Sequence, residues 1–82
     1  MAYVYILKST VDGVTYTGST SDIERRLKEN NDGKNVFTSR HHPWRLVYKE
    51  TFKELREARK REKYLKSAAG RRWLKVNNII PR

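Results

Sequence analysis

Two short runs of β-branched and aromatic residues, one on either side of an Asp-Gly pair, constrain the fold of this chain most. The runs are residues 3–7 and 14–17, and the Asp-Gly pair occupies positions 12–13. This pattern predicts a β-hairpin. Alternation places Tyr5 on one face of the first strand and Tyr16 on one face of the second. Whether the two faces coincide depends on the strand register, which the pattern leaves open.

A first helix is expected directly after the hairpin. Ser21 and Glu24 have the spacing of a capping box, in which two side chains satisfy free amides of the first turn. The Asn-Asn-Asp-Gly sequence at 30–33 is a strong stop signal, so the helix should end just before it. Arg26 flanks the apolar stripe of this helix and Arg25 points to the opposite side, so we expect different roles for them.

The second half of the chain predicts one more strand and a long helix. Residues 34–43 are polar and predict an irregular segment, whereas residues 44–49 alternate between apolar and polar, as a half-buried strand does. Thr51 and Glu54 form a second capping box, which begins the long helix, and Gly70 is expected to end it.

The apolar stripe of the long helix includes a carboxylate. Its steps of three and four residues continue only if Glu62 is counted with the apolar positions. A carboxylate on an inward face must be paired or must coordinate a cation, because its desolvation costs several kcal/mol otherwise. Glu62 is therefore a candidate functional residue.

These elements predict the α+β fold class in one domain. A chain of 82 residues supports one small core, and we expect a domain over residues 1–76, with a last helical segment at 71–76, and a C-terminal tail over residues 77–82. The absence of cysteine excludes disulfides and thiolate metal sites. No apolar run approaches the roughly 20 residues needed to cross a bilayer. A cytoplasmic protein without membrane association is expected.

The charge distribution favours a polyanionic partner. The formal net charge is +10, and residues 53–82 hold eleven basic and only three acidic residues. Such a field is typical of proteins that neutralise phosphates. A negatively charged membrane or protein surface would attract it too.

Several segments together resemble the GIY-YIG nuclease family, and its small single-domain members in particular. The motifs that name the family correspond to Tyr3-Val4-Tyr5 and Tyr16-Thr17-Gly18, and the likeness continues through residues 18–27, residues 40–48 and Glu62. The resemblance implies a three-stranded antiparallel β-sheet flanked by α-helices. It also implies one divalent metal ion and the hydrolysis of phosphodiester bonds in nucleic acid, with DNA favoured over RNA.

The same resemblance gives catalytic roles to four residues. Glu62 would bind Mg²⁺ or Mn²⁺, since hard cations prefer carboxylate oxygens. Arg26 would hold the phosphate, because its guanidinium can contact two phosphate oxygens. Tyr5 and Tyr16 would position or deprotonate the attacking water, and which of them is the base is left open. A tyrosine with a pKa of about 10 needs nearby positive charge to act as a base at neutral pH, which Arg26 and the metal could supply.

Further basic residues are expected to form the nucleic-acid-binding surface, namely Arg25, Lys28, Arg40, His41, Arg45, Arg59 and Lys63. Contacts of this kind hold phosphates and do not read bases. No small-molecule cofactor is expected, and a protein partner that supplies specificity is compatible with so small a chain.

Each of these residues also has a purely structural interpretation. Tyrosines are common in half-buried strands, and Glu62 could pair with Arg26, Arg59 or Lys66. Asn30 stands where many members of the family have a histidine. The alternative function is therefore a catalytically weak or inactive nucleic-acid-binding module on the same scaffold, and a third interpretation is a basic interaction protein.

Overall fold

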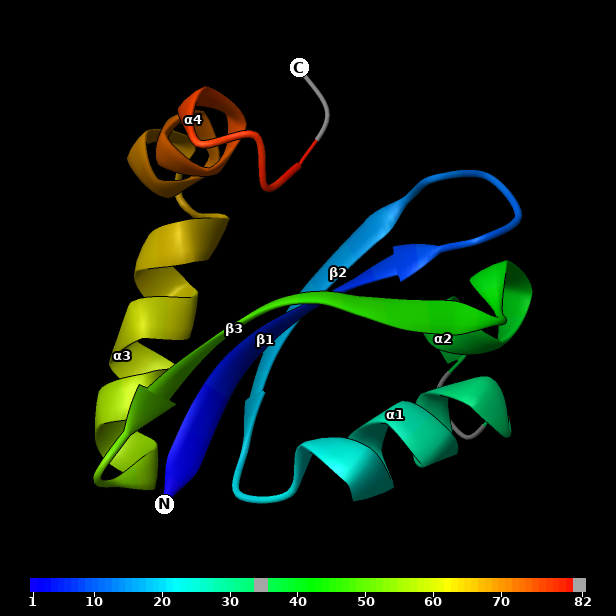
Figure 1. The fold of residues 1–82 in the computed structure, drawn as a ribbon, viewed down its shortest axis with the longest axis horizontal. Coiled ribbons are helices and arrows are strands. Elements are labelled where there is room, and N and C mark those ends of the chain that lie inside the picture. The colour runs from blue at the N-terminus through cyan, green and yellow to red at the C-terminus, as the bar shows by residue number, and fades with distance from the viewer. Residues whose placement is uncertain (34–35, 81–82) are drawn as a thin grey trace.

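The computed structural model describes residues 1–33 and 36–80, without the side chains of residues 36–38. It has the predicted α+β fold, a three-stranded antiparallel sheet flanked by helices (Figure 1). The strand order is β2-β1-β3, so β1 is central and β2 is an edge strand. The elements are β1 (Ala2–Ser9), β2 (Thr15–Thr20), α1 (Ile23–Asn31), α2 (Val36–His41), β3 (Trp44–Phe52), α3 (Leu55–Lys66) and α4 (Ala68–Val76).

The hairpin register decides the question that the sequence left open. Tyr5 pairs with Gly18 and Leu7 pairs with Tyr16 across β1 and β2. Directly paired residues of antiparallel strands project to the same face, so Tyr5 and Tyr16 lie on one face of the sheet. The turn between the strands contains Gly13 at a φ of 76°, a left-handed conformation that favours glycine.

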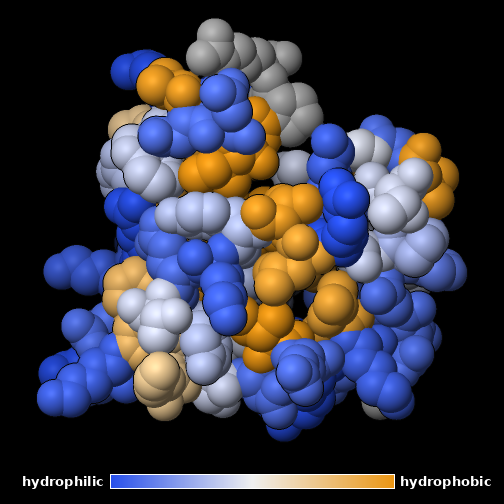
Figure 2. All heavy atoms as spheres, viewed as in Figure 1, coloured by the Kyte–Doolittle hydropathy of each residue, from blue (hydrophilic) through white to orange (hydrophobic). Residues whose placement is uncertain are grey.

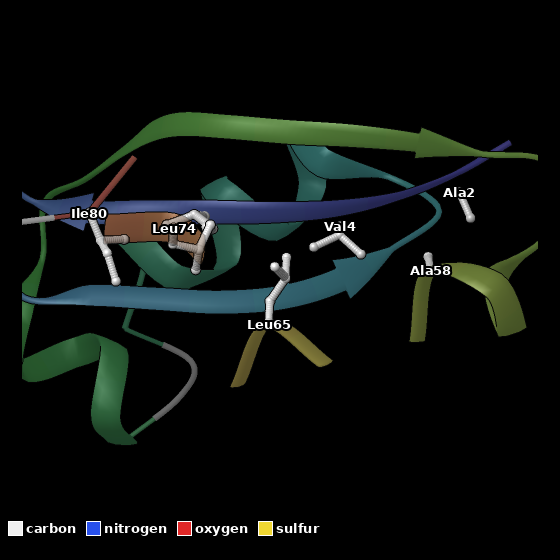
Figure 3. Close-up of a cluster of buried hydrophobic side chains, with 7 residues drawn as sticks. Ala2, Val4, Ala58, Leu65, Leu74 and Ile80 are labelled. Carbon is white, nitrogen blue, oxygen red and sulfur yellow. The ribbon is translucent and has the colours of Figure 1, made fainter. Parts of the chain in front are cut away.

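The two faces of the sheet carry two separate hydrophobic clusters, and Figure 1 shows α3 and α1 on opposite sides of the strands. In Figure 2, hydrophobic residues gather in the middle of the view, over the strands, and hydrophilic side chains project on the flank where α3 lies. The cluster under α3 and α4 joins Val4 to Leu65 and Leu74 (Figure 3). On the face toward α1, Leu7 and Trp44 form the buried cluster together with Tyr5.

The helices α1 and α3 begin at residues other than those predicted. Asp22, rather than Ser21, caps α1, and its Oδ1 accepts a hydrogen bond from Arg25 N at 3.1 Å. The capping box of α3 is formed by Glu54 and Glu57 and not by Thr51. The reason is that β3 is longer than expected and keeps Thr51 in the sheet, opposite Tyr3 of β1. In each case, the helix begins after the last residue that pairs in the sheet.

Two predictions for the connecting segments are wrong. The segment expected to be irregular contains the six-residue helix α2, since polar composition does not prevent a short helix that stops before a proline. The helix expected to run unbroken to Gly70 is divided at Ser67, which has an extended backbone and caps α4. Ser67 Oγ accepts a hydrogen bond from Gly70 N at 3.2 Å, so Gly70 lies inside α4 rather than at a helix end.

The chain continues to pack on the core after α4. Ile79 N donates a hydrogen bond to Leu74 O at 2.9 Å, and Ile80 is buried beside Leu74 (Figure 3). Of the predicted tail, residues 81–82 lie outside the described residues. Within the described part of the chain, no helix has both the length and the apolar character needed to span a membrane.

Candidate active site

A pocket of about 540 Å³ lies at the free edge of the sheet, between β2 and the helices α1 and α3. The residues predicted to be catalytic all line it, although they come from four different elements: Tyr5, Tyr16, Arg26 and Glu62. Arg59 and Lys63 of α3 line it as well, as do Gly18, Ser19 and Lys66. The fold therefore brings residues from distant parts of the chain to the edge strand.

Tyr5 occupies the space left by a missing side chain. A Cβ atom placed on Gly18 would lie 2.5 Å from Tyr5 Oη and 2.7 Å from Tyr5 Cζ. Both distances are shorter than real Cβ contacts, so only glycine allows the phenol to cross the edge strand into the pocket. The pairing of Tyr5 with Gly18 explains why the second motif ends in glycine.

The phenol of Tyr5 is neutral at physiological pH. Its pKa is raised to about 12. Burial is the largest cause, the neighbouring Tyr16 adds to the rise, and the guanidinium of Arg26 opposes it. Tyr5 is only 2% exposed, which accounts for the weight of desolvation. In this state the phenol is a hydrogen-bond donor. The positive charge of Arg26 alone does not lower the pKa of Tyr5 enough for the phenol to act as a base at neutral pH.

Tyr16 is held in a row of aromatic rings. Its ring centroid lies 6.4 Å from that of Tyr5 and 6.2 Å from that of the buried Trp44. Trp44 is itself fixed by Asn31 at the end of α1, whose Oδ1 accepts a hydrogen bond from Trp44 N at 2.5 Å. The positions of both tyrosines thus depend on packing between the sheet and α1.

Glu62 projects from α3 into the pocket and has a partner on each oxygen. Its Oε1 accepts a hydrogen bond from Ser19 Oγ at 2.5 Å, and its Oε2 accepts one from Lys66 Nζ at 2.6 Å. Its side chain is 22% exposed, so it can still reach a ligand in the pocket. Of the three structural partners considered for Glu62, the structure shows Lys66.

Arg26 faces the same pocket from α1. Within the described residues it has no ion-pair partner, and it is exposed. Arg59 and Lys63 are exposed too and have no acidic partner among the residues that the structure describes. These three cations are free to bind a phosphate group.

The donor set of the pocket suits one particular class of metal ion. The described residues contain no group of three or more His, Cys, Asp or Glu side chains that could hold a metal. The described residues therefore do not provide the three or four side-chain ligands of a protein zinc site. Magnesium commonly keeps several waters and needs only one or two protein carboxylates, so the Glu62 carboxylate fits such an ion. The ammonium of Lys66, which contacts Glu62 Oε2, would have to give way.

Five of the residues expected to bind nucleic acid do not line this pocket: Arg25, Lys28, Arg40, His41 and Arg45. Lys28 pairs with Asp32 at 3.6 Å. His41 packs on Trp44, and its Nδ1 lies 2.6 Å from Asp12 Oδ2, a hydrogen bond that lowers the pKa of Asp12. Arg25, Arg40 and Arg45 are exposed. A role for these five in binding remains a prediction.

Besides Gly18, which the sequence marked only as part of the second motif, two residues of the pocket were not assigned to the site by the sequence. Ser19 could not be connected to Glu62 without the packing of α3 on β2, because the two are 43 positions apart. Lys66 carried a clearer signal, since it follows Glu62 by four positions and residues at this spacing are neighbours on a helix.

Fold and pocket together describe a small α+β domain with cations and one carboxylate in a pocket at a sheet edge. Comparisons with known proteins show the family to which this domain belongs. The family model described as the GIY-YIG catalytic domain matches residues 1–76. The chain is 46% identical over 67 residues to a UPF0213 protein of Clostridium perfringens, which covers 80% of this chain and 71% of the relative. It is 40% identical over 75 residues to a UPF0213 protein of Staphylococcus saprophyticus, which covers 90% of each.

A solved structure is similar over nearly the whole chain. The solution NMR structure of a UPF0213 protein from Bacillus halodurans has 36% sequence identity and a TM-score of 0.56, over 96% of this chain and 85% of that one. The chain therefore belongs to the GIY-YIG family. This is a family of nucleases, which are generally metal-dependent and act on nucleic acid.

Proposed function

We propose that this protein is a metal-dependent nuclease that hydrolyses phosphodiester bonds in nucleic acid, with DNA as the favoured substrate and the cytoplasm as its compartment. The observation that carries the proposal is the convergence of Tyr5, Tyr16, Arg26 and Glu62 on one open pocket. Membership of the GIY-YIG family supports the same reaction class.

Phosphate binding is assigned to the cations of the pocket. Arg26 from α1 faces Arg59 and Lys63 from α3, so a phosphodiester between the helices meets positive charge from two sides. Charge that grows on the phosphate oxygens in the transition state is stabilised best by donors that are already in place. Arg26 has the strongest claim to this role, because its guanidinium can contact two oxygens at once.

Water activation is assigned to the tyrosines. With its pKa at about 12, Tyr5 keeps its proton at neutral pH. We therefore assign to Tyr5 the orientation of the attacking water through its Oη. We assign the acceptance of the water's proton to the phenolate form of Tyr16, which must first lose its own proton to solvent and which the positive charge of Arg26 would favour. Glu62, with Ser19 beside it, would hold Mg²⁺ or Mn²⁺. When bound, such an ion supplies positive charge that polarises the phosphate and favours deprotonated water.

A second candidate function rests on one specific contact. Lys66 Nζ contacts Glu62 Oε2 at 2.6 Å, so an internal cation already neutralises the proposed metal ligand. A protein in which this pair persists would bind nucleic acid through its positive charge and would not cleave it. The two functions differ in the effect of a divalent metal, and this difference can be measured.

The test is cleavage of labelled single-stranded, duplex and branched DNA, and of RNA, with and without Mg²⁺ or Mn²⁺. Glu62→Gln should reduce metal-dependent cleavage by about 10²-fold or more and leave nucleic-acid binding nearly unchanged. Glu24→Gln is the matched control, because Glu24 is exposed on α1 and does not line the pocket. Salt-sensitive binding without cleavage of any substrate would reject the nuclease and support the binding module.

A further inference from the structure

A second hollow continues the active-site pocket along the edge strand. It has a volume of about 270 Å³ and is lined by residues of β2, α3 and α4. Tyr16 and Lys66 line both hollows, so the two are adjacent. The second hollow adds Thr15, Thr17 and Arg71, none of which the proposed mechanism uses.

The strand side of this hollow presents a row of hydroxyl groups. Thr15, Thr17 and Ser19 are alternate residues of β2, and Thr17 and Ser19 pair with Ile6 and Val4 of β1. Alternate residues share one face of a strand and repeat every roughly 6.8 Å. Ser19 donates to Glu62, whereas the hydroxyls of Thr15 and Thr17 have no hydrogen-bond partner among the described residues.

The helix side of the hollow presents positive charge. Arg71 lies in the first turn of α4, is exposed, and has no acidic partner in the part of the chain that the structure describes. Lys66 Nζ reaches the boundary between the hollows, where it lies 5.9 Å from the centre of the Tyr16 ring. No carboxylate lines the second hollow within the described residues. The unpaired hydroxyls of Thr15 and Thr17, opposite the unpaired guanidinium of Arg71 and beside the Lys66 ammonium that Glu62 holds, suit a phosphate group.

We infer that the hollow between Thr17 and Arg71 is a second phosphate-binding subsite, which holds a backbone phosphate adjacent to the one in the active-site pocket. This inference rests on the proposed function, since it takes nucleic acid to be the ligand. The bound nucleic-acid strand would then run along β2, with Arg26 near one end of its path and Arg71 near the other. The edge strand suits this course, because no neighbouring strand covers it.

The test removes one phosphate charge at a time. A DNA tetranucleotide, in which each linkage in turn is replaced by a neutral methylphosphonate, is titrated against the protein at low salt in the presence of a chelator. For the wild-type chain, replacement of the linkage in the active-site pocket should weaken binding. Replacement of one other linkage, the one held in the second subsite, should also weaken binding, by about fivefold. Arg71→Gln should weaken binding of the unmodified DNA by the same factor and should abolish the further effect of that linkage. Thr17→Val should produce a smaller loss at the same linkage.

Arg72→Gln is the matched control, because Arg72 is the exposed neighbour of Arg71 and lines neither hollow. It should keep the wild-type dependence on every linkage. If Arg71→Gln also keeps that dependence, the subsite is rejected, whether or not the protein cleaves DNA. If cleavage is absent but the dependence on Arg71 is found, the nuclease is rejected and the subsite stands.

Discussion

At the scale of single residues, the absence of a side chain at Gly18 positions the Tyr5 phenol. A Cβ atom at position 18 would lie 2.7 Å from Tyr5 Cζ, and the ring could avoid it only by leaving the pocket. We therefore expect Gly18→Ala to reduce cleavage by about 10²-fold, since a misplaced group near the reacting atoms can cost this much. It should also cost about 1–3 kcal/mol of stability, as overpacking does. Cleavage assays and urea denaturation measure the two effects.

Gly13→Ala provides the control for this prediction. Gly13 lies in the turn of the same hairpin at a φ of 76°, and the nearest atom to a Cβ there is Lys8 Cε at 3.9 Å. Alanine at this position costs about 1–2 kcal/mol through backbone strain alone. Activity per folded molecule should remain. Full activity of the Gly18→Ala protein would show that the ring of Tyr5 is not needed in its observed place.

At the scale of secondary-structure elements, an ion pair holds α3 on β3. Arg61 Nε donates to Glu50 Oε1 at 2.8 Å and Arg61 Nη2 donates to Glu50 Oε2 at 3.1 Å, while Tyr48 Oη donates to the same carboxylate. Burial raises the pKa of Glu50, but these hydrogen bonds outweigh it and hold the pKa below its usual value. Arg61 precedes Glu62 on α3, and Glu62 contacts Ser19, so we expect this pair to help fix the rotation of the helix that carries Glu62.

Breaking this pair should therefore affect both stability and the site. We expect Glu50→Gln to cost about 1–2 kcal/mol of unfolding free energy, and to lower cleavage because α3 carries Glu62. Arg61→Gln combined with Glu50→Gln should cost less than the sum of the two single changes. The exposed pair of Arg56 with Glu54 is the control, and Arg56→Gln should change stability by less than about 0.5 kcal/mol. If Glu50→Gln and Arg56→Gln lose equal free energies of unfolding in urea denaturation, the Glu50–Arg61 pair does not hold α3 on β3.

The sequence predicts the order of the strands and long helices, because hydrophobic alternation and turn residues are local signals. It does not predict where α3 stops, since the break at Ser67 depends on packing of Gly70 against the backbone of Tyr64 and Leu65. The roles of Tyr5, Tyr16 and Arg26 were predicted through the resemblance to family motifs, whereas Glu62 was also indicated by its place on the apolar stripe of the long helix. The contact of Ser19 with Glu62 was not predicted, because it depends on how α3 lies across β2.

At the scale of the whole molecule, charge and burial are divided between different parts of the structure. The basic C-terminal third forms α3 and α4, whose cations surround both hollows. The two tyrosines with raised pKa values lie on opposite faces of the sheet. Tyr5 belongs to the cluster next to α1, and Tyr48 packs against the cluster next to α3. Ionisation of either tyrosine would place a negative charge in or beside a hydrophobic cluster.

This arrangement predicts a loss of stability at alkaline pH. Burial is the largest cause for both residues and raises the pKa of each to about 12. The native state therefore holds these protons more tightly than the unfolded chain, in which a tyrosine titrates near about 10. Stability is fully present below pH 10 and falls as the pH rises toward 12, by at most about 1.4 kcal/mol per pH unit for each tyrosine.

Urea denaturation at a series of pH values measures this dependence. Tyr5→Phe and Tyr48→Phe should each reduce the decrease of unfolding free energy with pH above pH 10. Near pH 8, the unfolding free energy should not depend on the ionisation of either tyrosine. Parallel pH profiles for Tyr5→Phe and the wild-type chain would show that the Tyr5 phenol titrates as in the unfolded chain, which would contradict the raised pKa of Tyr5.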